Sequence, residues 1–147
     1  MVIHCAARLA APLISAAALL GVTAAWLYDV YVFSPALNHS AWHYPVVAGP
    51  YVVIGLFGLA NYLARANVVF AVYGLVGALF IAGSGLLLWY QNFFGSGNDL
   101  GFGLGLLFHL GAALAIAAAG WLAMLLYKGW QWSMAPARPA AAKAENL

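Results

Sequence analysis

Residues 84–120 read SGLLLWYQNFFGSGNDLGFGLGLLFHLGAALAIAAAG and contain the end of one apolar segment, a loop and most of a second apolar segment. Each segment, extended to its full length, suffices to cross about 30 Å of hydrocarbon as an α-helix. A glycine-rich turn between two such segments predicts a pair of antiparallel transmembrane helices. His109 is the only histidine, acidic or basic side chain that we expect well inside a spanning segment, so any chemistry of the chain is expected to involve it.

The composition of the whole chain extends this interpretation. Of its 147 residues, 67% are hydrophobic and 5% are charged, whereas soluble domains have about 25% charged residues. The chain is therefore predicted to be an all-α, polytopic membrane protein with four transmembrane helices, which leaves no room for a separate soluble domain. The net charge of +2 gives no indication of nucleic-acid binding. With Cys5 as the single cysteine, an internal disulfide and a cysteine metal cluster are excluded.

The apolar runs define the expected domain organisation. Residues 1–132 are predicted to form one four-helix transmembrane domain, and residues 133–147, rich in Ala and Pro, a disordered cytoplasmic tail. The expected spans are residues 9–28, 46–64, 68–90 and 101–127. The first span could instead be a cleaved signal peptide, but its aromatic end at Trp26 and Tyr28 favours a retained helix.

Basic residues predict the orientation of the chain, because lysine and arginine accumulate in short cytoplasmic loops. All five fall on one side of a four-span arrangement: Arg8, Arg65, Lys128, Arg138 and Lys143. We therefore expect an integral protein of the cell (inner) membrane with both termini in the cytoplasm.

Small residues indicate how the helices pack, because close approach of backbones drives helix association in lipid. Residues 71–85 and 105–120 each carry alanine and glycine at spacings of three or four, and His109 lies on the second of these seams. We expect His109 to face other helices rather than lipid. Asn61, near the inner end of the second span, is expected to form an interhelical hydrogen bond.

Histidines and acids of the predicted outer half suggest two kinds of site. His43 and His109 could hold a b-type haem between them near the outer face. Alternatively, His39 and His43, spaced i, i+4, could bind copper or zinc together with one of Asp29, Asp99 or His109.

A simpler alternative requires no cofactor. His39 and His43 would be solvated residues of the membrane interface, and His109 would donate to a carbonyl of a neighbouring helix. Asp29 and Asp99 would be hydrated acids at span ends, and a role of the histidines in proton relay or substrate contact also stays open. The sequence has no nucleophile with a nearby base, no phosphate-binding loop and no HExxH motif, so hydrolase and kinase chemistry is not supported.

The segment SGLLLWYQNFFGSGNDLG followed by a helix that contains His109 resembles the membrane cytochrome b (gamma) subunits of formate dehydrogenases and related four-helix di-haem anchors. The resemblance covers Ile81 to Tyr127 only. It implies that His109 is a haem ligand. Two haems need four axial ligands, and the other spans supply no interior histidine, so His43 would be a second ligand without a counterpart in that pattern.

These observations lead us to expect a small integral subunit or anchor of a membrane redox complex. It would lie in the lipid bilayer with other membrane subunits or copies of itself, would not be catalytic alone, and could hold one haem b or metal near the outer face. A homo-oligomeric small-solute transporter or channel, with His109 and Asn61 along its path, is the alternative. A structural accessory membrane protein without a ligand is a third possibility.

Overall fold

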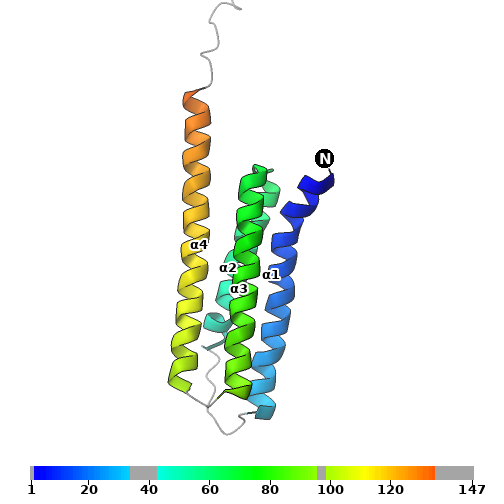
Figure 1. The fold of residues 1–147 in the computed structure, drawn as a ribbon, viewed down its shortest axis with the longest axis vertical. Coiled ribbons are helices and arrows are strands. Elements are labelled where there is room, and N and C mark those ends of the chain that lie inside the picture. Colours follow the sequence, from blue (N-terminus) through cyan, green and yellow to red (C-terminus); the bar gives the residue numbers. More distant parts are fainter. Residues whose placement is uncertain (1, 34–42, 96–98, 135–147) are drawn as a thin grey trace, which may run out of the picture.

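Four long helices make up the described part of the chain. A computed structural model describes residues 2–33, 43–95 and 99–134, and these residues include no strand. The elements are α1 (Val2–Tyr28), which continues as one π-helical turn (Asp29–Phe33), α2 (His43–Leu63), α3 (Val68–Phe94) and α4 (Asp99–Ser133). The helices run up and down as an antiparallel bundle (Figure 1), and all four are long and apolar enough to cross a membrane. The predicted all-α, four-helix membrane architecture is confirmed.

All four helices are longer than the predicted spans, and the difference is largest for α1, α3 and α4. Helix α1 begins at Val2 instead of residue 9, α3 continues to Phe94 past residue 90, and α4 continues to Ser133 past residue 127. The apolar pattern marks only the part of a helix inside hydrocarbon, whereas backbone hydrogen bonding continues through the interface. The loop that contains His39 and nearly all of the predicted tail lie outside the described residues.

The helices are not arranged as a closed ring of four. Helices α2 and α3 contact each other and form a central pair, α1 packs on both of them, and α4 also packs on both. Within the described residues α1 and α4 make no contact. As a result α2 is the most buried helix, while α1 and α4 expose most of their surface to the surroundings of the bundle.

Glycines allow the close approaches of the helices. A Cβ atom at Gly58 of α2 would lie 3.1 Å from the Ala11 Cβ and the Pro12 ring of α1. On the other side of the central pair, the ring of Phe57 of α2 fills the space that a Cβ atom at Gly120 of α4 would take. Phe57 is 1% exposed. Small residues therefore hold both flanking helices against the central pair, as expected for association in lipid.

The turn between α2 and α3 closes one end of the bundle. The Arg65 amide donates to the Tyr62 carbonyl at 3.1 Å and the Ala66 amide to the Asn61 carbonyl at 3.0 Å. This hydrogen-bond pattern is a Schellman motif, which requires a left-handed residue after the helix, and Arg65 occupies that position with φ 48°. Asn67 then caps α3 by accepting from the Val69 amide at 3.4 Å.

Candidate functional site

His109 lies at the junction of α2, α3 and α4. It is 5% exposed, and its Nε2 lies 2.9 Å from the carbonyl oxygen of Ile81 on α3. A carbonyl oxygen can only accept a hydrogen bond, so Nε2 carries the proton and donates it. The expectations that His109 faces protein and donates to a neighbouring helix are both confirmed.

Tyr51 of α2 and Gly85 of α3 complete the surroundings of the imidazole. The Tyr51 ring stands edge-on to the His109 ring, with 5.6 Å between their centroids and 74° between their planes. Gly85 follows Ile81 by one helical turn, and a Cβ atom there would fall on the Tyr51 hydroxyl and lie 3.1 Å from the His109 Cε1. The glycine thus makes room for both side chains against the backbone of α3.

The sequence of α4 places His109 on this junction. Residues one turn apart lie on the same face of a helix, and the residue one turn after His109 is Ala113, which is 0% exposed. One turn before it, Gly105 accommodates the side chain of Leu88 from α3. A polar side chain in a spanning segment is most stable on such a protein-facing stripe, where a backbone carbonyl can accept its proton.

The environment of His109 does not fit an axial haem ligand. An axial histidine needs a nitrogen lone pair that is open to a space as large as the macrocycle. Here Nε2 is engaged with Ile81, and Nδ1 is buried with no hydrogen-bond partner in the described part of the chain. Ligation through either nitrogen would require breaking the bond to Ile81 or moving the surrounding helices apart.

Among the other candidate ligands, the structure describes the side chains of His43 and Asp29. His43 is the first residue of α2 and is exposed. Asp29 is 8% exposed, so the expectation of a hydrated acid is wrong for this residue. His39 and the side chain of Asp99 lie outside the described residues. In residues 2–33, 43–95 and 99–134 there is no group of three His, Cys, Asp or Glu side chains that could hold a metal ion.

Asn61 is a second buried polar group, on α2. It is 1% exposed, and its amide Nδ2 donates to the Phe70 carbonyl of α3 at 3.3 Å. The predicted interhelical hydrogen bond is confirmed. Its Oδ1 is buried without a partner among the described residues.

Two features of the structure were not predicted from the sequence. Tyr51 gave no signal of its own, since it is one of eight tyrosines and only the three-helix packing brings it to His109. The second feature is a cavity at the C-terminal end of α4, with Lys128 and Arg65 in its lining. Both residues were expected at the same membrane surface, but the cavity itself was not predicted.

Comparisons of the chain with protein families, curated proteins and solved structures found no match.

Proposed function

We propose that this chain is a small integral subunit of a larger membrane assembly, not catalytic alone, which binds its partner through the outward face of α4. The observation that carries the proposal is a stripe of small residues on α4 that the chain's own bundle does not cover. This α4 stripe consists of Gly111, Ala115, Ala118 and Ala119, all exposed.

The α4 stripe has the geometry of a helix-packing surface. A Cβ atom at Gly111 would meet no other atom within 4 Å, and the alanines follow it at i+4, i+7 and i+8. Small residues give a lone helix no advantage against lipid, but they let a second helix approach closely. The stripe lies apart from Ala113, Ala117 and Gly120, which are buried against α2 and α3.

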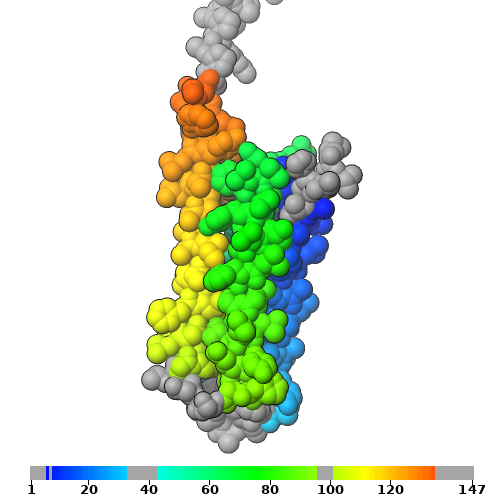
Figure 2. All heavy atoms as spheres, in the orientation of Figure 1, coloured from blue at the N-terminus to red at the C-terminus, as the bar shows by residue number. Residues whose placement is uncertain are grey.

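The length of α4 supports the same proposal. The helix continues to Ser133 and projects beyond the rest of the bundle (Figures 1 and 2). Trp130 and Trp132 on this projection are 59% and 86% exposed. A projecting helix with exposed tryptophans offers a partner subunit a binding surface that the bundle leaves uncovered.

The arrangement favours a subunit over a transporter. The polar groups of a transport path would be Asn61 and His109, but both are buried inside one bundle. Ile54 and Phe57 lie between Tyr51 and Asn61 along α2, and each is 1% exposed. Apolar side chains therefore fill the interior between the two polar sites, and neither site faces a neighbouring protomer.

The redox character and the orientation of the assembly are further parts of the proposal. Redox chemistry is supported only by the resemblance of the segment from Ile81 to Tyr127 to membrane cytochrome b subunits. Since His109 does not fit an axial haem ligand, the cofactor would belong to a partner subunit. A purified chain without visible absorption is the expected result.

The positions of the basic residues support cytoplasmic termini in a cell (inner) membrane. An impermeant thiol reagent should label Asn98→Cys, but not Ser133→Cys, in intact cells that carry the Cys5→Ser background.

The assembly itself is tested by changing the α4 stripe. Gly111→Leu should leave the chain folded but reduce its recovery in a larger complex on native gels of solubilised membranes. Gly83→Leu is the matched control, because Gly83 is also exposed and its Cβ would also meet nothing within 4 Å, but on α3. Equal recovery of the complex with both variants, or migration of the unchanged chain as a monomer, would refute the proposal.

A further inference from the structure

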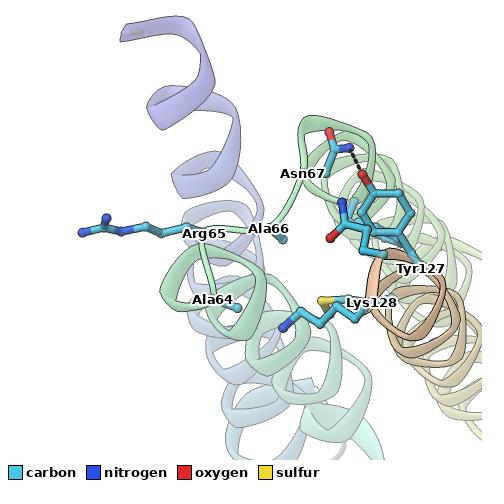
Figure 3. Close-up of a pocket in the computed structure, with 9 residues that line it drawn as sticks. Ala64, Arg65, Ala66, Asn67, Tyr127 and Lys128 are labelled. Carbon is cyan, nitrogen blue, oxygen red and sulfur yellow. Dashed lines mark hydrogen bonds between the residues drawn. The ribbon is translucent and has the colours of Figure 1, made fainter. Parts of the chain in front are cut away.

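A cavity opens at the end of the bundle where α1 begins and α2 ends. Its volume is about 270 Å³, and it lies between the α2–α3 turn, the start of α3 and the last turns of α4 (Figure 3). Its lining residues are Ala64, Arg65, Ala66, Asn67, Phe70, Met124, Tyr127, Lys128 and Gln131. We call it the basic-end cavity.

Among the described residues, the charged side chains at the end of the bundle with the basic-end cavity are all basic. The Lys128 side chain extends from α4 toward the α2–α3 turn, while the Arg65 side chain points away from the cavity (Figure 3). Arg8, near the start of α1, lies at the same end of the bundle. The two aspartates of the described residues, Asp29 and Asp99, belong to the opposite end. No carboxylate in residues 2–33, 43–95 and 99–134 therefore neutralises Lys128.

Neutral donors and an apolar floor complete the lining. Asn67 donates from Nδ2 to the Tyr127 hydroxyl at 3.4 Å, which ties α3 to α4 across the cavity, and the Gln131 amide adds further donor capacity. Asn67 is also the N-cap of α3, so the positive end of that helix faces this region. Phe70 and Met124 supply the apolar part of the lining.

Aromatic residues indicate where the basic-end cavity lies relative to the membrane surface. Tyr127 lines it and Trp130 lies on the next turn of α4, and such aromatic residues mark the level of lipid headgroups in membrane proteins. Basic pockets between transmembrane helices at this level bind anionic lipid headgroups. We propose that the basic-end cavity binds the phosphate of an anionic phospholipid, with Lys128 as its main cation and the apolar floor against the glycerol backbone.

The proposal predicts specific effects on lipid binding. A lysine at the membrane surface contributes about 1 kcal/mol to the attraction of anionic lipid, so Lys128→Gln should weaken binding about fivefold. Lys128→Arg should keep it. Ala64→Leu should also weaken binding, because it fills the cavity and leaves every charge in place.

The experiment is native mass spectrometry of the full chain released from detergent with phosphatidylglycerol or phosphatidylcholine. The unchanged chain should retain one phosphatidylglycerol in preference to phosphatidylcholine, and Lys128→Gln and Ala64→Leu should reduce this preference. Arg8→Gln is the matched control, since it removes one charge from the same end outside the lining. Circular dichroism of each variant verifies that it is folded.

Three results would overturn the proposal. Equal losses with Arg8→Gln and Lys128→Gln, with no effect of Ala64→Leu, would show diffuse attraction of lipid to a basic surface. Displacement of the lipid by millimolar inorganic phosphate would show a site for a free anion. Equal retention of phosphatidylglycerol and phosphatidylcholine by the unchanged chain would show that the cavity does not select an anionic headgroup.

Discussion

At the scale of single residues, the contact among Tyr51, Gly85 and His109 determines how closely α2 and α4 approach α3. The Tyr51 hydroxyl occupies the position that a Cβ atom at Gly85 would take. Gly85→Ala should therefore lower the free energy of unfolding by about 1–3 kcal/mol, the usual range for overpacking a core. Unfolding in mixed detergent micelles, followed by circular dichroism, measures the change.

Two further variants isolate the cause of that loss. Gly83→Ala, on the exposed face of the same helix where nothing lies within 4 Å, should be neutral or stabilise by up to about 1 kcal/mol through helix propensity. Combining Gly85→Ala with Tyr51→Phe should recover part of the loss, because the hydroxyl is gone. Equal effects of Gly85→Ala and Gly83→Ala would contradict the described contact.

His109 is expected to stabilise the bundle without being essential for folding. Interhelical hydrogen bonds in membrane proteins contribute about 0.6 kcal/mol on average and at most about 1.7 kcal/mol. Loss of the hydrogen bond to Ile81 in His109→Leu should lower the free energy of unfolding by an amount in this range. His109→Gln, which keeps a donor, should lose less. A visible absorption band that disappears in His109→Leu would instead assign a cofactor to this residue.

The sequence allows the direction of His109 to be predicted, but not its partners. A lone imidazole among apolar residues must face protein, and its seam of alanine and glycine identifies the face. Which carbonyl accepts the proton depends on the vertical register of α3 against α4, and no local pattern encodes that register. For the same reason, the contact of Tyr51 with His109 could not be predicted from the sequence. The cavity at Lys128 is formed by three separate elements, so no single stretch of sequence predicts it.

At the scale of elements, the α2–α3 turn contains a residue in an unfavourable conformation. Arg65 has φ 48°, and a left-handed conformation costs L-residues other than glycine about 1–2 kcal/mol. Arg65→Gly should raise the free energy of unfolding by up to about 1 kcal/mol, because greater freedom of the unfolded chain offsets part of the gain. Arg65→Val should lower it. The same unfolding assay compares the variants. A higher free energy of unfolding for Arg65→Val than for Arg65→Gly would contradict the described turn.

The sequence predicts the existence of each helix better than it predicts the residues at which the helix begins and ends. Four apolar runs of about 20 residues predict four helices that are long enough to span a membrane. The ends depend on capping and on the interface, where apolar periodicity no longer applies. Helix α4 shows the difference most clearly, since its last residues, from Lys128 to Ser133, are polar or aromatic apart from Gly129 and were expected to lie beyond the predicted span.

At the scale of the whole molecule, the bundle is a central pair of helices with one flanking helix on each side. Because α1 and α4 do not contact each other in the described residues, each has a broad face without a partner in that part of the chain. The α4 face carries small residues and continues past the end of the bundle, which is unusual for a surface that contacts only lipid. This arrangement is the basis for proposing a subunit of a larger assembly.

Photo-crosslinking from the α4 stripe in native membranes tests that proposal most directly. A photoreactive side chain in place of Leu122, which is 59% exposed and lies one turn after Ala118 on the same face as the α4 stripe, should give one crosslinked product, heavier than the chain by the mass of another polypeptide. The same group in place of Leu86 of α3, which is 73% exposed, should give none. Products with lipid alone at both positions would contradict a partner on α4. A product of twice the mass of the chain would also contradict a different subunit as the partner and would instead show a homo-oligomer.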